Sequence, residues 1–210
     1  MNDREVLLFG DANAWERWLA ANHDKSQGVY LAIAKKESGR ASVTHQEALD
    51  VALCHGWIDG VRNKLDEVSF LQSFGPRRSR STWSVINRDK VAALIAAGRM
   101  RPAGQAEIDR AKADGRWDAA YAGSKTIQVP EDLAKALAAN PKAKAFFATL
   151  SSQNRYAILF RLGNVKKAET RVRNLVKFVG MLERGETIYP QGKKAEKPAA
   201  KAAKKPARKR

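Results

Sequence analysis

Residues 29–34, VYLAIA, form an unbroken apolar run made mostly of β-branched, aromatic and small side chains. A strand has two faces, so a run that is apolar throughout predicts a strand that is buried on both of them. Such a strand requires neighbours in a sheet. We expect an edge strand over 6–9 and a hairpin whose two strands cover 57–63 and 66–73.

Helices are expected between these strands. Asp11 suits the N-cap of a helix over 12–22. Thr44 and Glu47 have the spacing of a capping box, in which each side chain satisfies a backbone N–H at the start of a helix. That helix should end at Gly56, because glycine adopts the left-handed C-terminal conformation at low cost.

Two more helices are predicted before residue 125. The first covers 88–97, is capped by Asn87 and turns three apolar side chains inward. These are Val91, Leu94 and Ile95. Pro102 opens the second helix, which Gly115 ends.

From residue 126 onward the pattern indicates helices that follow one another without strands. The last long helix, over 166–184, carries an apolar arc and an opposite basic face. The arc is Ala168, Val172, Leu175, Val176, Val179 and Leu182, and the basic face is Lys166, Arg173, Lys177 and Arg184. The sequence therefore predicts an α+β fold with three parts: a mixed domain with a hairpin over 1–125, an all-helical domain over 126–190 and a disordered Lys/Ala/Pro tail over 191–210.

The net charge of +17 at pH 7 comes from both the tail and the rest of the chain. Residues 193–210 hold nine Lys or Arg and one Glu, which leaves +9 elsewhere. The tail could bind nucleic acid without base preference by releasing counterions, or it could act only as a solubilising tether. No aromatic residue is interleaved in it, so base stacking is not implied.

Several classes of protein are disfavoured. Residues 1–18 lack the long apolar region of a signal peptide, and no segment approaches the ~18 apolar residues of a spanning helix. The single cysteine, Cys54, excludes an internal disulfide and favours the cytoplasm. We expect no metal, because no two histidines are four residues apart, and no cofactor, because both common phosphate-binding glycine motifs are absent.

The stretch 48–87 holds Trp, Arg, Asp and Asn among turn residues, where a core needs none of them. Asp59 suits a general base or a partner for arginine, or else it bonds turn amides. The loop from Arg77 offers forked donors, an aromatic wall and a helix start, as an anion site requires, although a solvated loop remains an alternative. The segment 114–121 repeats this combination and would complete one pocket if the fold brings it close; otherwise each segment is local packing. The ligand-binding candidates are His55, Trp57, Asp59, Arg77, Arg78, Trp83, Asn87, Arg116, Trp117 and Tyr121, with a secondary basic face of Lys166, Arg171 and Arg173.

Six blocks of sequence carry a family resemblance. They are ALC-x-GWIDG (52–60), F-x-PRR with S-x-WS-x-x-N (74–87), GRM-x-x-AG (98–104), DGRWDAAY (114–121), VPEDL (129–133) and K-x-x-ETR-x-R (166–173). In this order they resemble the YdeI/OmpD-associated family, also called bacteriocin-protection proteins. The resemblance implies a role in resistance to antimicrobial peptides and a link to an outer-membrane porin, with no established reaction or cofactor. The motif members carried over are Trp57, Asp59, Arg77, Arg78, Trp83, Asn87, Arg116, Trp117, Lys166, Thr170 and Arg171. The resemblance also implies an aromatic residue where this chain has His55.

Three functions stay open. The leading hypothesis is a soluble bacterial protein of envelope-stress or peptide-resistance type that binds an anionic small molecule or protein partner among its Arg and Trp side chains. The second is an enzyme that acts on an anionic metabolite with Asp59 as base. The third is a nucleic-acid-associated protein that acts through residues 193–210.

Overall fold

The structure is a computed structural model that describes residues 4–192. The described residues up to 125 and those from 126 onward form two compact units, which are taken in turn. The predicted tail lies outside the described residues from 193 onward. The strands are β1 (Val6–Leu7), β2 (Val29–Ala34), β3 (Trp57–Lys64) and β4 (Ser69–Pro76). The helices are α1 (Ala12–Asn22), α2 (His45–Cys54), α3 (Val85–Ala96), α4 (Pro102–Ala113), α5 (Glu131–Ala139), α6 (Pro141–Thr149), α7 (Ser152–Gly163) and α8 (Ala168–Glu183).

The first unit is built on a mixed sheet with the strand order β1-β2-β4-β3. β1 runs parallel to β2, whereas β2 and β3 both pair with β4 in the antiparallel sense, so β3 and β4 form the predicted hairpin. Val29, Leu31 and Ile33 of β2 are almost fully buried, and the residues between them are half-buried. The strand was predicted correctly, although only one of its faces is completely covered.

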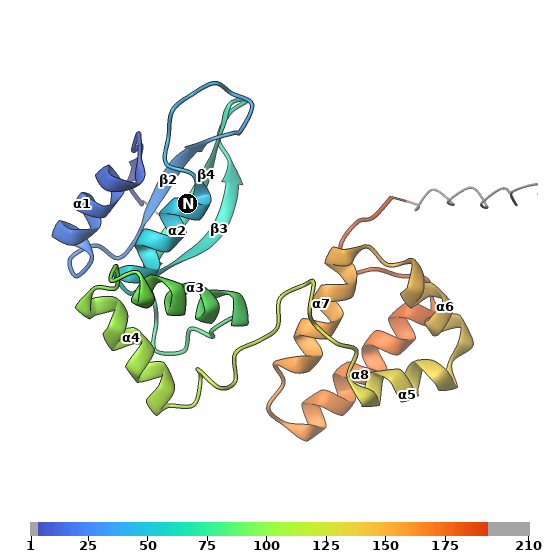
Figure 1. Ribbon diagram of the computed structural model, residues 1–210. Coiled ribbons are helices and arrows are strands. Elements are labelled where there is room, and N and C mark those ends of the chain that lie inside the picture. Colours follow the sequence, from blue (N-terminus) through green and yellow to red (C-terminus); the bar gives the residue numbers. More distant parts are fainter. Residues whose placement is uncertain (1–3, 193–210) are drawn as a thin grey trace, which may run out of the picture. The chain divides into compact units, whose positions relative to one another are not determined.

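The core of the first unit is aromatic. Helix α2 lies across the sheet and packs against α1 (Figure 1). The Trp15 ring of α1 lies 5.7 Å from Phe74 on β4 and 6.2 Å from Trp57 on β3. Trp15 Nε1–H donates to the carbonyl of Ala48 at 3.1 Å, which satisfies its polar atom in the core. These contacts tie both helices to the sheet.

Local signals set most of the helix ends. The Thr44–Glu47 capping box is present, and Gly56 has a left-handed φ of +74°. The prediction for α3 was wrong in two respects. Ser84, not Asn87, is the N-cap, because its hydroxyl accepts the backbone N–H of Asn87 at 3.1 Å. Ile95 is exposed rather than turned inward, since helix α3 buries only its Val91 and Leu94 side.

Helix α4 begins against the C-terminal end of α2. The backbone N–H of Arg101 donates to Cys54 O at 3.2 Å. A Cβ atom on Gly104 would lie 2.3 Å from the same carbonyl oxygen, and one on Gly56 would lie 2.9 Å from Ala103 O. Only glycine permits so close an approach at these two positions, so they fix where α4 starts.

The second unit contains helices and no strand within its described residues (Figure 1). Helix α8 packs against α6, α5 and α7. Its predicted apolar arc was partly wrong: Val172 and Val176 are 62% and 69% exposed, whereas Phe178 and Leu182 are buried. The side chains that contact α5 and α6, rather than the helical period of the sequence alone, decide which face of α8 is covered.

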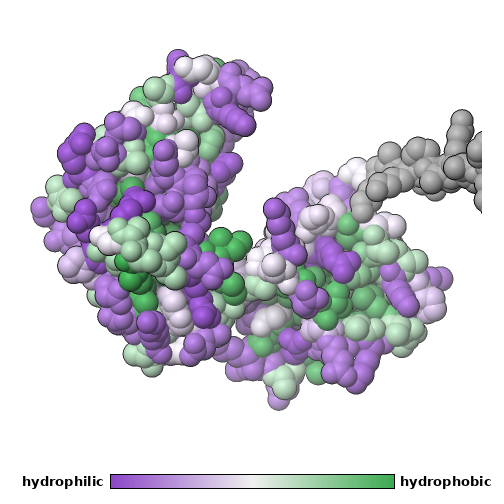
Figure 2. All heavy atoms as spheres, viewed as in Figure 1, coloured by the Kyte–Doolittle hydropathy of each residue, from purple (hydrophilic) through white to green (hydrophobic). Residues whose placement is uncertain are grey.

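The α+β class is confirmed, with a mixed four-stranded sheet and helices in the first unit and helices alone in the second. Figure 2 shows hydrophilic residues over much of the viewed face of each unit, with hydrophobic patches among them. Within residues 4–192, no helix has the length and apolar character needed to cross a membrane.

Candidate functional site

Two loops that are distant in sequence meet in the first unit and bring four predicted side chains together. The loop after β4 supplies Arg77 and Trp83, and the segment after α4 supplies Arg116 and Trp117. The backbone N–H of Tyr121 donates to the carbonyl of Trp83 at 3.0 Å, which joins the two loops. We call Arg77, Trp83, Arg116 and Trp117 the Arg–Trp cluster.

The side chains of the Arg–Trp cluster pack tightly on one another. The guanidinium carbon of Arg77 lies 3.7 Å from the ring centre of Trp83. The rings of Trp83 and Trp117 are 5.0 Å apart, and Arg116 forms an ion pair with Asp114 at 2.7 Å. Arg77 is 5% exposed and Trp83 is 1% exposed, so these groups converge as packed side chains.

Arg77 carries a buried charge with few partners. Its Nη2 donates to Thr82 O at 3.3 Å. Its Nε, like Trp83 Nε1, has no hydrogen-bond partner among the described residues. Burial lowers the pKa of Arg77 from its ordinary value to about 10, and the next largest influence, Tyr121, opposes this shift. Keeping a guanidinium here costs free energy, because little of its lost hydration is replaced.

Trp57, Arg78 and Asn87 have separate surroundings. Trp57 is a core residue whose Nε1–H donates to the carbonyl of His23 at 3.0 Å. Arg78 is exposed, and its backbone N–H donates to Ser81 Oγ at 2.9 Å. Asn87 is half-buried in the first turn of α3.

Asp59 contacts a histidine rather than an arginine. Its Oδ2 lies 3.0 Å from Nε2 of His45, the first residue of α2, and both side chains are about 30% exposed. A carboxylate that orients an imidazole is the arrangement of many acid–base pairs. In the structure, Asp59 is thus paired with His45.

The basic residues of the second unit differ in their partners. Lys166 and Arg173 are exposed. Arg171 Nε and Nη2 contact the two carboxylate oxygens of Asp132 on α5, at 2.6 and 3.0 Å. Arg171 thus joins two helices in addition to contributing charge.

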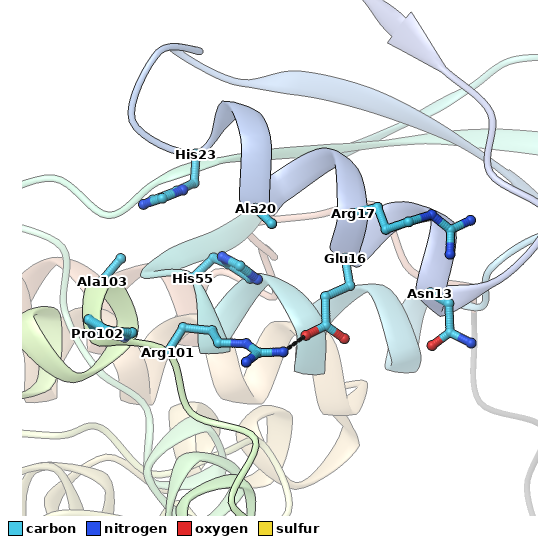
Figure 3. Close-up of a pocket in the computed structure, with 9 residues that line it drawn as sticks. All are labelled: Asn13, Glu16, Arg17, Ala20, His23, His55, Arg101, Pro102 and Ala103. Atoms are coloured by element: carbon cyan, nitrogen blue, oxygen red, sulfur yellow. Dashed lines mark hydrogen bonds and ion pairs between the residues drawn. The ribbon is translucent and has the colours of Figure 1, made fainter.

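A pocket of about 670 Å³ lies where α1, the end of α2 and the start of α4 meet (Figure 3). We call it the α1–α4 pocket. It is lined by Asn13, Glu16, Arg17, Ala20, His23, His55, Arg101, Pro102 and Ala103. Of the ten ligand-binding candidates from the sequence, His55 belongs to this lining.

His55 is the most unusual side chain of the α1–α4 pocket. It is 5% exposed, and neither ring nitrogen has a hydrogen-bond partner among the described residues. The ring lies among the other lining side chains, 5.5 Å from the ring of His23 (Figure 3). Burial lowers the pKa of His55 below 6.5, followed by the effect of His23, so the ring is neutral at neutral pH. A neutral imidazole offers one N–H donor and one acceptor nitrogen.

Charges of both signs line the same pocket. Arg101 Nη2 lies 2.5 Å from Glu16 Oε1, and Arg17 is an exposed neighbour of Glu16 on α1 (Figure 3). His23 Nδ1 lies 3.1 Å from the carbonyl of Leu19; a carbonyl can only accept, so that nitrogen carries the proton. Nε2 of a neutral His23 is then an acceptor.

The first turn of α4 adds a backbone donor at the pocket. Arg101 is the N-cap, and its side chain makes no capping hydrogen bond. Pro102 has no N–H, so the first amide of the helix is that of Ala103, which lines the pocket, whereas Gly104 is buried against Cys54 and Met100. With the helix dipole, such an amide favours negative charge.

Glu16, Arg17, His23 and Arg101 were not predicted as site residues. Nothing local distinguishes Glu16 or Arg17 from the polar side of any surface helix. The useful signal was Arg101 directly before Pro102, which puts a cation at an uncapped helix start. Within residues 4–192, no three His, Cys, Asp or Glu side chains group closely enough to hold a metal ion.

Comparisons with known families give one match in each unit of the fold. Residues 126–185 match the family described as "Bacteriocin-protection, YdeI or OmpD-Associated", abbreviated OmdA. The second unit is an OmdA domain. Residues 7–107 match a domain of unknown function, DUF8412. The OmdA match covers the VPEDL and K-x-x-ETR-x-R blocks, whereas the α1–α4 pocket lies within the DUF8412 match. No curated protein and no solved structure matches the chain significantly.

Proposed function

We propose that this OmdA-domain protein binds a small organic anion in the α1–α4 pocket, and that this binding serves protection against bacteriocins or antimicrobial peptides. One observation carries the proposal: His55 is 95% buried at a pocket, and both of its ring nitrogens lack partners among the described residues. Buried polar atoms are usually hydrogen-bonded, and exceptions gather at functional sites. A ligand would supply a missing partner.

The charge around the pocket favours an anion. Arg17, Arg101 and the amide groups at the start of α4 present positive charge, against one carboxylate from Glu16. Ala20, Pro102 and Ala103 supply an apolar part of the wall, which suits a ligand with a hydrocarbon body. The +9 charge of residues 1–192 raises the local concentration of anions.

The positive net charge of the chain also indicates how protection would work. Antimicrobial peptides are commonly rich in Lys and Arg, and a chain with a net charge of +17 repels them. Protection would then act through an anionic molecule or partner, in the cytoplasm that the single cysteine favours, rather than by capture of the peptide. The OmdA match supplies the biological direction, and the pocket supplies the chemistry.

Titration of the full-length chain with small anions tests this proposal. The probes are acetate, 4-methylpentanoate, benzoate, methyl phosphate and inorganic phosphate, followed by two-dimensional amide NMR. At least one probe should shift the Ala103 and Gly104 amides in a saturable way. Arg101→Gln and His55→Ala should each weaken that binding about tenfold, the loss expected for one charge-assisted hydrogen bond. Arg40→Gln, which changes an exposed arginine in the turn after β2, should leave it unaltered.

Two results would overturn the proposal. One is the absence of any saturable shift at the pocket amides with all five probes. The other is equal weakening by Arg40→Gln and Arg101→Gln, which would show that only the overall positive charge attracts the probes. Thermal melts of each variant separate loss of binding from loss of folding.

A second candidate function, acid–base catalysis on an anionic metabolite, is favoured by the contact between His45 and Asp59. Turnover of a metabolite that is lost in both Asp59→Asn and His45→Gln would support it. Turnover that survives Asp59→Asn would remove Asp59 from the reaction. Binding of nucleic acid through residues 193–210 is tested by deleting them, and binding that persists or ignores salt would exclude that role.

A further inference from the structure

Glu16 stands in the α1–α4 pocket although a site for a simple anion has no use for a carboxylate. Its Oε1 contacts Arg101 Nη2 at 2.5 Å, and its side chain is 27% exposed, against 52% for Arg101 (Figure 3). This contact holds together α1 and α4, but it also places a negative and a positive group side by side on the wall of the pocket.

A ligand with negative charge alone meets a conflict at this place. To bind Arg101 it must compete with Glu16 for the guanidinium, and the two negative groups then lie close together. A ligand that carries a cation next to its anion removes the conflict. Its carboxylate binds the guanidinium of Arg101 and its ammonium binds the carboxylate of Glu16, so that each charged side chain keeps a partner.

We propose that the ligand of the α1–α4 pocket is a zwitterion in which a carboxylate and an ammonium are attached to the same carbon, as in a free α-amino acid. This inference rests on the proposed function, because the carboxylate of the zwitterion is the anionic group that the α1–α4 pocket would bind. Arg101 and the amide of Ala103 donate to the carboxylate. Glu16 accepts from the ammonium.

The two histidines fit a zwitterion as well. His23 directs Nδ1 toward Leu19 O, which leaves Nε2 as an acceptor. His55 has one donor and one acceptor nitrogen, both without partners among the described residues. An ammonium has three hydrogens to donate, and a carboxylate has lone pairs to accept. The N–H of His55 can therefore donate to the carboxylate, or its other ring nitrogen can accept from the ammonium; the two nitrogens point apart, so the ligand reaches one of them.

The test uses three probes that share one hydrocarbon body. L-Leucine carries both charges, 4-methylpentanoate lacks the ammonium, and 3-methylbutylamine lacks the carboxylate. Full-length protein is titrated with each, and the amides of Ala103 and Gly104 are followed by NMR. Leucine should bind about tenfold more tightly than either single-charge probe. 4-Methylpentanoate has no ammonium for Glu16, and 3-methylbutylamine has no carboxylate for Arg101.

Glu16→Gln should abolish this preference. The change removes the group that accepts the ammonium, so affinity for leucine should fall about tenfold while affinity for 4-methylpentanoate stays equal or rises. Glu37→Gln is the matched control, because Glu37 is an exposed carboxylate in the turn after β2. It should leave all three affinities unchanged.

The outcomes separate this inference from the proposed function. If 4-methylpentanoate binds as tightly as leucine in the wild-type protein, the ligand is a simple anion; the zwitterion is then excluded and the proposed function stands. The same conclusion follows if leucine does not shift the pocket amides but another anion does. If neither leucine nor any anion shifts them, both proposals fall. The comparison of probes on the wild-type chain does not depend on whether Glu16→Gln folds.

Discussion

Arg171 on α8 donates two hydrogen bonds to the carboxylate of Asp132 at the start of α5, from Nε at 2.6 Å and from Nη2 at 3.0 Å. Its Nη1 also donates to the carbonyl of Leu162 at 2.8 Å. Arg171→Ala should therefore lower the free energy of unfolding of the second unit by about 1–2 kcal/mol. Arg173→Ala, at an exposed position two residues further on, should change it by less than about 0.5 kcal/mol. Urea denaturation followed by circular dichroism measures both, and equal effects would contradict a structural role for Arg171.

The same pair should make the stability of the second unit depend on acid. The hydrogen bond from Arg171 lowers the pKa of Asp132 below its ordinary value of 3.8. A carboxylate with a depressed pKa in the folded state stabilises the fold above the unfolded value, and this contribution disappears as the pH falls through the folded pKa. Asp132→Asn should therefore cost stability at neutral pH and much less well below pH 3.8. A cost that is independent of pH would exclude this linkage.

The elements that were predicted correctly from sequence depend on residues close together in the chain. The Thr44–Glu47 capping box spans four positions, and Gly56 ends α2 through its own backbone conformation. The β2 strand follows from the composition of residues 29–34. Ile95 and Val176 were assigned to the wrong environment because helical periodicity shows which residues share a face, whereas packing decides which face is covered.

The pocket could not be predicted in the same way. Glu16, His55 and Arg101 come from three segments, and they meet because α4 starts against the end of α2. The sequence shows Gly104 as one glycine within a helix and does not reveal that Cys54 O lies against it. Candidates taken from the Arg- and Trp-rich segments did converge at Arg77, but as packed side chains around a buried guanidinium.

Gly104→Ala should disturb the start of α4 more than any ordinary helix substitution. Its Cβ would lie 2.3 Å from Cys54 O and 2.7 Å from the carbonyl carbon, both backbone atoms that cannot rotate away. We expect a loss of about 1–3 kcal/mol in the free energy of unfolding of the first unit. Gly163→Ala, at the end of α7, is the control: no atom lies within 4 Å of its Cβ, so it should be neutral or stabilise by up to about 1 kcal/mol. Similar losses in the two variants would contradict the close approach at Gly104.

Arg77 should be replaceable by an apolar side chain without loss of stability. Its charge is buried, with one hydrogen bond of 3.3 Å from the side chain and an Nε without partner among the described residues. Arg77→Met keeps contact with Trp83 and removes the cost of desolvation, so its unfolding free energy should equal or exceed that of the wild type by up to about 2 kcal/mol. Arg77→Ala also removes the packing and should cost about 1–3 kcal/mol. Chemical denaturation compares the three proteins, and a Met variant as unstable as the Ala variant would mean that the charge itself stabilises the fold.

His55→Phe should remove a dependence of folding on pH. Burial first, and then His23 and Arg101, lower the pKa of His55 below 6.5, while Glu16 opposes the shift. As the pH falls, His55 is protonated near pH 6.5 in the unfolded chain and only at lower pH in the folded chain. The wild type therefore loses stability as the pH falls below 6.5. Phenylalanine keeps the aromatic shape without the nitrogens, so the variant should lack this loss. The difference in unfolding free energy between His55→Phe and wild type should be constant above pH 6.5 and should grow in favour of the variant below it. Urea denaturation measures the unfolding free energy of both proteins over this pH range. Titratable groups that both proteins contain contribute equally and cancel in the difference. If the two unfolding free energies change with pH in parallel, burial does not hold His55 neutral.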